Sequence, residues 1–249
     1  MSVVVDAIFE AVSGITTTGS TVFSELDKMP KGLLLWRGIL QWLGGIGIII
    51  VAMVFLPELR VGGMQIFRAE GFDMLGKILP RATTIAFQIS IIYVGITVAC
   101  GLAYVLAGMS FFDAVVHSFT TVATGGFSNY DGSFSVFSWK VEYVAILFMI
   151  LSALPFVRYV QLINGQGTAV FKDPQVKAFI FLICFLVLLS TLVLSLQLNL
   201  SFELVFRKAL LNITSIITGT GFASTNYMLW GGFLAVSYTH LTLPTTPYV

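Results

Sequence analysis

Two kinds of apolar stretch alternate along this chain, and they differ in length. The long ones meet the roughly 20 apolar residues that a helix needs to cross a bilayer. The short ones cannot cross, and each ends in a loop rich in Thr and Gly. The pattern predicts an all-α integral membrane protein. Long helices are expected at 33–56, 82–107, 139–163 and 176–196, and half-length helices at 6–19, 113–126 and 208–221.

The three half-length segments share one register. Thirteen positions separate the first residue of each segment from the glycine that ends it: Asp6 and Gly19, Asp113 and Gly126, Lys208 and Gly221. A unit of spanning helix, half-helix, loop and spanning helix therefore recurs along the chain. Such internal repeats indicate pseudo-symmetry about an axis, with the site of action on that axis. We expect repeated helix–re-entrant pore loop–helix units around a central ion pathway.

The repeat also predicts how the chain is divided. The first unit lacks a leading helix, and the third stops after its loop, so we interpret the chain as an internal fragment of a longer protein. A Thr- and Pro-rich tail closes the chain and has no helical period. The expected segments are a first unit at 1–56, a cytoplasmic loop at 57–81, a second unit at 82–163, a cytoplasmic loop at 164–175, a truncated third unit at 176–236 and a non-native tail at 237–249.

Composition narrows the class further. Hydrophobic residues make up 57% of the chain and charged residues 10%, and the mean hydropathy is +0.95. A soluble domain carries about 25% charged residues, so this chain lacks the polar surface of one. A net charge of +1 gives no reason to expect nucleic acid as a partner. Both cysteines, Cys100 and Cys184, lie within apolar runs, where packing is expected rather than a disulfide.

The Thr/Gly loops carry the candidate chemistry. A K⁺ ion gives up its water only where oxygen atoms replace it, and rings of backbone carbonyls do so in ion filters. Glycine adopts the backbone angles that such a loop requires without a Cβ penalty. The helix before each loop would direct its negative C-terminal end toward the ion. The candidate K⁺ ligands are Thr16, Thr17, Thr18, Gly19, Val122, Ala123, Thr124, Gly125, Gly126, Ile217, Thr218, Gly219, Thr220 and Gly221.

Several motifs resemble the TrkH type of bacterial potassium-uptake subunit, within the wider group of Trk, Ktr and HKT transporters. The resemblance runs from about residue 6 to residue 230 and keeps the order of the motifs. They are WRGILQWLGGIGI at 36–48, LP at 56–57, VGGMQ at 61–65, RAE at 68–70, ATGGFS at 123–128 and TGFA at 220–223.

The resemblance implies four helix–pore-loop–helix units around one K⁺ pathway, with one filter glycine in each. Carried over to this sequence, these are Gly19, Gly126 and Gly221, and about 2.5 of the four units are present. It also implies a multi-pass protein of the bacterial inner membrane, a homodimer, and a cytosolic nucleotide-binding partner similar to TrkA. The fourth unit and the gate after the third loop are missing, so we do not expect this chain alone to form a complete selective pore.

Other polar residues are first interpreted as structural. Arg37 lies near the outer end of a predicted span, where its side chain is expected to extend to the headgroups. Asp6 and Asp113 are expected to cap the half-helices. His117 is expected to be a packing residue. Pro155 predicts a kink within the third long helix.

A glycine cluster in the first long segment and two polar residues after the second loop each allow two interpretations. The glycines at 44, 45 and 47 favour close helix packing over a phosphate loop, since the strand and the Lys-Ser/Thr ending of such a loop are missing. Asn129 and Asp131, just beyond the second loop, fit either a cation-attracting vestibule or a solvated turn.

The leading hypothesis is a potassium pore subunit that is not an enzyme and needs no cofactor. One alternative is an ion-coupled secondary transporter with re-entrant hairpins, which would place ionisable residues in mid-span. An intramembrane enzyme would need a nucleophile or a metal cluster, and neither cysteine has a His or an acid nearby in sequence. A non-functional fragment of the pore subunit is the third alternative.

Overall fold

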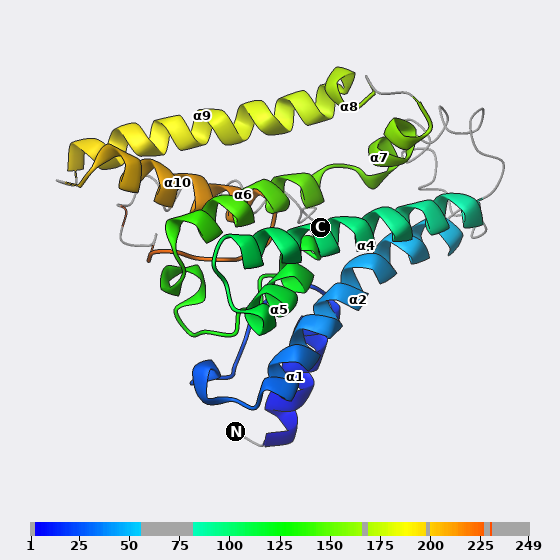
Figure 1. Cartoon of the computed structure of the whole chain (residues 1–249), viewed down its shortest axis with the longest axis horizontal. Coiled ribbons are helices and arrows are strands. Elements are labelled where there is room, and N and C mark those ends of the chain that lie inside the picture. Colours follow the sequence, from blue (N-terminus) through cyan, green and yellow to red (C-terminus); the bar gives the residue numbers. More distant parts are fainter. Residues whose placement is uncertain (1–2, 56–81, 166–168, 198–199, 227–229, 231–249) are drawn as a thin grey trace, which may run out of the picture.

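The computed structural model describes residues 3–55, 82–165, 169–197, 200–226 and 230, and within these ranges all regular structure is helical (Figure 1). The all-α prediction is therefore confirmed. The predicted loop at 57–81 and tail at 237–249 lie outside the described residues. The helices are α1 (Val3–Ile15), α2 (Lys31–Phe55), α4 (Ala82–Leu106), α5 (Phe111–Val122), α6 (Trp139–Ala153), α7 (Phe156–Ile163), α8 (Ala169–Lys172), α9 (Pro174–Gln197) and α10 (Phe202–Ile217), with short 3₁₀ turns at Leu26–Lys28 and Ser133–Val136.

Each half-length helix packs against one or two longer helices, and some of these are distant in sequence. α1 lies along α2, α5 packs on α2 and α4, and α10 packs on α9 and α6. α10 begins earlier than the sequence predicted, so Lys208 lies inside the helix rather than at its start. Glu203 in the first turn favours this earlier start, because an acidic side chain stabilises a helix N-terminus.

The third long segment is not a single rod, which corrects the prediction of one helix with a kink. α6 and α7 meet at an angle of 85°. Pro155 causes the break, because the residue before a proline is displaced from the helical region, and Leu154 is extended with φ −74° and ψ 147°. The Tyr159 hydroxyl donates to the Leu151 carbonyl oxygen at 2.6 Å and so satisfies one free carbonyl at the end of α6.

An aromatic core joins α4 and the turn before α6 to the segment after α10. Tyr104, Phe134 and Phe222 are almost completely buried, and Phe134 and Phe222 have ring centroids 4.2 Å apart. These rings come from α4, from the turn before α6 and from the segment after α10. Between helices in a membrane, close packing of such rings stabilises the fold through van der Waals contacts. The core therefore fixes the position of the segment that follows α10.

The outward faces of the long helices are apolar. Large hydrophobic side chains on α4 and α9, such as Phe87, Leu102, Phe181 and Leu188, are more than half exposed. Among the described residues, two helices have the length and composition to cross a membrane, Ile85–Leu106 and Pro174–Leu196, and the bent pair of α6 and α7 counts as a third if taken as one span. Exposed apolar faces of this extent are typical of lipid contact, in agreement with the predicted membrane class.

Candidate functional site

The three predicted loops are loop 1 (residues 16–19), loop 2 (122–126) and loop 3 (217–221), and the glycine that ends each one is called its outer glycine. All three have the same unusual backbone. The residue two positions before the outer glycine and that glycine itself both have positive φ in every loop. For Thr, a β-branched residue, this left-handed region is a true outlier. The φ values are 56° and 77° at Thr17 and Gly19, 51° and 74° at Thr124 and Gly126, and 72° and 89° at Gly219 and Gly221.

Local hydrogen bonds account for this shared shape. In each loop the amide just before the outer glycine donates to a carbonyl in the last turns of the preceding helix, five positions back. The bonds are Thr18 N to Ser13 O at 3.0 Å, Gly125 N to Thr120 O at 2.9 Å and Thr220 N to Ser215 O at 2.9 Å. Each half-helix therefore ends in the same way: an amide of the loop turns back and donates to a carbonyl oxygen in the last turns of the helix.

The loops lie side by side in chain order. A Cβ atom added to Gly19 would collide with the Gly125 carbonyl oxygen, and one added to Gly126 would collide with the Thr220 carbonyl oxygen. A Cβ atom added to Gly221 would meet no described atom within 4 Å. Gly19 and Gly126 thus each face the residue before the next outer glycine, which is the relation that a rotation about an axis produces. The structure brings the sequence-predicted residues of all three loops together.

Loops 1 and 3 differ from loop 2 in their side chains. In loop 1 the Thr16 and Thr18 hydroxyls lie 2.8 Å apart, and in loop 3 the Thr218 and Thr220 hydroxyls have the same separation. Loop 2 has Ala123 and Gly125 at these two positions. At these two positions, Thr hydroxyl oxygens are thus present in loops 1 and 3 and absent from loop 2.

Gln41 of α2 takes the place of the missing side chain in loop 2. It is fully buried, its Nε2 donates to Gly125 O at 2.6 Å, and its Oε1 accepts from Phe127 N at 3.0 Å. A Cβ atom on Gly125 would lie 2.4 Å from Cδ of the Gln41 amide, so a side chain at this position would displace Gln41. Sequence reasoning missed this role. The available signal was an amide within an apolar helix, one turn before the glycine cluster.

Close helix packing is confirmed for two of the three glycines in the α2 cluster, Gly44 and Gly45, whereas a Cβ atom on Gly47 would meet no described atom within 4 Å. A Cβ atom on Gly44 would collide with the Ile15 carbonyl oxygen at the end of α1. One on Gly45 would lie 2.7 Å from the Tyr93 hydroxyl and 3.0 Å from the Cα atom of Ala123. These glycines let α2 approach the starts of loops 1 and 2 directly.

The prediction that Arg37 extends to the headgroups is wrong. Its side chain is 3% exposed and its Nε donates to Glu10 Oε1 at 2.7 Å. Its guanidinium also donates to the Ser128 carbonyl oxygen at 3.1 Å and lies 4.2 Å from the centroid of the Phe127 ring. A buried carboxylate on α1 supplies the partner that makes burial of the charge possible. Arg37 therefore links the first half-helix to the segment after loop 2.

The capping predictions also need correction. Ser110 caps α5, since its Oγ accepts from the Asp113 amide at 3.2 Å, while Asp113 lies in the first turn. Asp6 likewise lies within the first turn of α1 rather than before it. Asn129 is buried, and its Nδ2 donates to Asp113 Oδ1 at 2.8 Å. Asp131 accepts from the amides of residues 25 and 26. Both residues beyond loop 2 thus bind protein groups.

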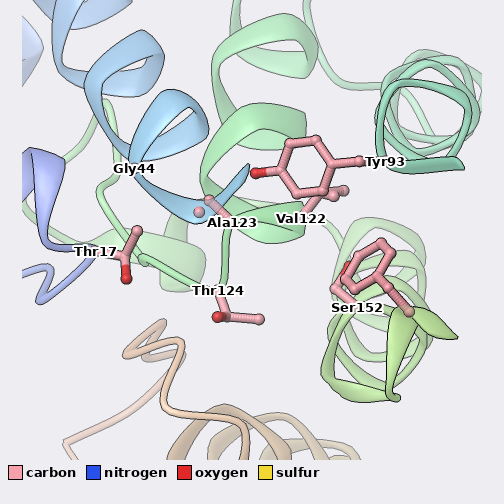
Figure 2. A pocket seen from close by; sticks show the side chains of 9 residues that line it. Thr17, Gly44, Tyr93, Val122, Ala123, Thr124 and Ser152 are labelled. Atoms are coloured by element: carbon pink, nitrogen blue, oxygen red, sulfur yellow. The ribbon is translucent and has the colours of Figure 1, made fainter. Parts of the chain in front are cut away.

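A cavity of about 200 Å³ lies at the inner ends of loops 1 and 2. Figure 2 shows Thr17 and Thr124 on one side of it, and Tyr93 and Ser152 on another. No described group hydrogen-bonds the buried Ser152 hydroxyl. The cavity therefore offers hydroxyl groups next to the two left-handed Thr residues.

Comparisons with known proteins agree with this arrangement. The TrkH family profile, described as a cation transport protein, matches residues 1–239. TrkI of Halomonas elongata, a Trk system potassium uptake protein, is 42% identical over 239 residues, which is 95% of this chain and 48% of that protein. TrkH of Vibrio parahaemolyticus is 40% identical over 245 residues, which is 94% of this chain and 50% of that protein.

The fold is similar to a solved member. The crystal structure of the potassium transporter TrkH from Vibrio parahaemolyticus matches with a TM-score of 0.83 and 37% identity. The matched region covers 97% of this chain and 49% of the TrkH chain. The chain spans about half the length of the relatives that it matches. The family match, the identities and the shared fold together show that this chain belongs to the TrkH family of cation transport proteins.

Proposed function

We propose that this chain forms part of a potassium-conducting pore, with its three loops as part of the selectivity filter. The observation that carries the proposal is the matched pair of left-handed residues in three loops that lie against one another. Loop residues in such conformations present backbone oxygen atoms without a helical partner, and dehydrated cations bind these groups. The proposed ligands are the oxygen atoms of residues 16–19, 122–126 and 217–221.

One carbonyl oxygen of loop 2 is excluded from the proposed K⁺ ligands. The Gly125 carbonyl oxygen accepts the Gln41 amide at 2.6 Å, so it serves the loop scaffold. The ends of α1, α5 and α10 add a favourable field, since each directs its carbonyl end to the loops and a helix C-terminus carries about half a negative charge. This field favours a cation over an anion.

The membrane setting and the partners are part of the same proposal. The named relatives are components of a Trk uptake system, which supports a multi-pass protein of the bacterial inner membrane that acts as a homodimer with a TrkA-like nucleotide-binding subunit. We place the docking surface at 57–81 and 164–175. The second segment is anchored at one end, because Arg158 Nε donates to Asp173 Oδ2 at 2.6 Å. Burial raises the pKa of Asp173, but the Gln175 amide and Arg158 outweigh burial and bring that pKa below its usual value.

Ion uptake by cells that lack their own potassium uptake tests the function. With the protein expressed from its native gene, we expect Rb⁺ uptake that K⁺ inhibits and Na⁺ does not. Gly126→Ala should reduce this discrimination, because its φ of 74° and the Thr220 carbonyl oxygen both oppose a Cβ atom. Gly95→Ala is the matched control, since Gly95 is helical and a Cβ atom there meets nothing within 4 Å.

The outcome separates a filter from a packing turn. Unchanged discrimination by Gly126→Ala at a normal protein level would show that loop 2 does not select the ion. A wild-type protein that takes up no Rb⁺ would contradict the proposed function as a whole.

A further inference from the structure

One buried polar position repeats in all three half-helices. Nine residues before each outer glycine stands a polar side chain: Glu10 before Gly19, His117 before Gly126 and Asn212 before Gly221. Their relative exposures are 3%, 0% and 0%. Burying a polar group without a partner costs roughly 1–3 kcal/mol. Three such residues at one register therefore need a common reason.

The common feature is what they bind. Each side chain reaches across to the segment that leaves its own loop, two or three residues beyond the outer glycine. Glu10 Oε1 accepts from the Thr21 hydroxyl at 2.8 Å, and its Oε2 accepts from the Val22 amide at 3.1 Å. Asn212 Oδ1 accepts from the Ser224 amide at 3.3 Å, and its Nδ2 donates to the Ser224 hydroxyl at 3.1 Å.

His117 makes the equivalent contact in the second unit. Its Nδ1 lies 2.8 Å from the Asp113 carbonyl oxygen, which can only accept, so Nδ1 carries the proton. Nε2 of the neutral ring then accepts from the Ser128 hydroxyl at 3.2 Å. The Ser128 oxygen in turn accepts from the Tyr130 amide at 3.1 Å. The imidazole thus joins the half-helix to the exit of loop 2.

A second set of contacts reaches the same three segments. In the first, Arg37 Nη2 donates to the Thr21 hydroxyl at 3.2 Å. Arg37, paired with Glu10, donates to the Ser128 carbonyl oxygen at 3.1 Å. Lys208, paired with Glu142, donates to the Ser224 carbonyl oxygen at 3.3 Å. Each loop exit is thus held both by the polar side chain of its half-helix and by a cation.

We infer that Glu10, His117 and Asn212 are positioning residues that fix the spacing between each half-helix and its loop exit, and so set the ion discrimination of the loops. The inference rests on the proposed function. Carboxylate, imidazole and amide are unlike in charge and shape, and they share only this bond to the loop exit. A role limited to core packing would be filled equally well by apolar side chains.

His117→Phe is the sharpest test, because an aromatic ring fits the site. The His117 ring lies 5.6 Å from the Phe134 centroid and 5.1 Å from the Phe137 centroid, in edge contacts that a Phe ring can keep. The variant removes the bond to Ser128. We expect the ratio of Rb⁺ to Na⁺ uptake to fall roughly threefold to tenfold, the range that the loss of one hydrogen bond produces in an equilibrium.

Three further variants complete the design. His117→Gln, whose terminal amide reaches the place of Nε2, should restore most of the ratio. Ser128→Ala removes the same bond from the loop side and should lower the ratio similarly, even if His117→Phe does not fold. Ser118→Ala is the matched control, because that buried hydroxyl on the same helix donates to the Val115 carbonyl oxygen and should leave the ratio unchanged.

The measurements are uptake of each ion and the amount of protein in the membrane. A selective wild type with equally selective His117→Phe and Ser128→Ala variants would overturn the positioning role and leave the proposed function intact. A wild type without Rb⁺ uptake would overturn both. A lowered ratio in Ser118→Ala would show that any loosening of α5 has this effect, which also overturns the inference.

Discussion

Loop 2 (residues 122–126) and loop 3 (residues 217–221) share one backbone shape in different surroundings. Loop 2 is mostly buried and is held by Gln41, with the next loop against Gly126. A Cβ atom on Gly219 or Gly221 of loop 3 would meet no described atom within 4 Å. The shape therefore comes from the local hydrogen bonds of each half-helix, whereas the neighbours decide how well a substitution is tolerated.

The buried ion pairs near loops 2 and 3 also differ in their surroundings. Arg37 pairs with Glu10 behind loop 2, and both side chains are almost fully buried. Behind loop 3 the buried Glu142 binds two cations, Arg207 and Lys208, whose side chains are 11% and 19% exposed. Loop 2 therefore depends on a single ion pair, and loop 3 on a shared one.

The largest expected difference concerns these charges. Arg37→Leu leaves Glu10 buried without its cation, which costs roughly 3–5 kcal/mol in the free energy of unfolding. Lys208→Leu leaves Glu142 with Arg207, so the cost should be roughly 1–2 kcal/mol. Thermal unfolding of the purified protein in detergent compares the two variants. Equal shifts of the midpoint would show that the two carboxylates are equally dependent on one cation.

The next difference concerns the outer glycines. Gly221→Ala should cost roughly 1 kcal/mol, for the left-handed backbone alone. Gly126→Ala should cost roughly 1–3 kcal/mol more, because the added methyl group also overlaps the Thr220 carbonyl oxygen. The same thermal unfolding measurement applies. Equal costs would indicate that Gly221 also faces a carbonyl group in the assembled protein.

The smallest effect is expected where the two loops differ in residue type at one position. Thr124 occupies the left-handed position in loop 2, and Gly219 occupies it in loop 3. Because a Cβ atom on Gly219 meets no described atom within 4 Å, Gly219→Thr should cost only the strain of its left-handed backbone, roughly 1–2 kcal/mol, and should keep Rb⁺ uptake near the wild-type rate, which makes its effect on function the smallest of the three. An inactive but well-folded variant would show that loop 3 needs a flexible residue there.

Local features made much of the fold predictable. The length of the apolar stretches predicted the helices, and the register of glycines predicted three like loops, because both depend on neighbours within a few turns. The predicted ends of the helices were less accurate, since α10 begins at Phe202 rather than near Lys208. The assignment of the loops as a K⁺ filter and the division into units remain predictions.

The sequence by itself determined the membrane class, the short helices and the loops, because apolar length, glycine backbone freedom and helix-end hydrogen bonds act locally. Only the tertiary structure decided what the buried polar groups do. Arg37 binds residues 27 and 91 positions away, and Gln41 binds residues 84 and 86 positions away. A polar side chain in an apolar helix is compatible with several locations, and packing of distant segments selects one of them by supplying the partner that its burial requires.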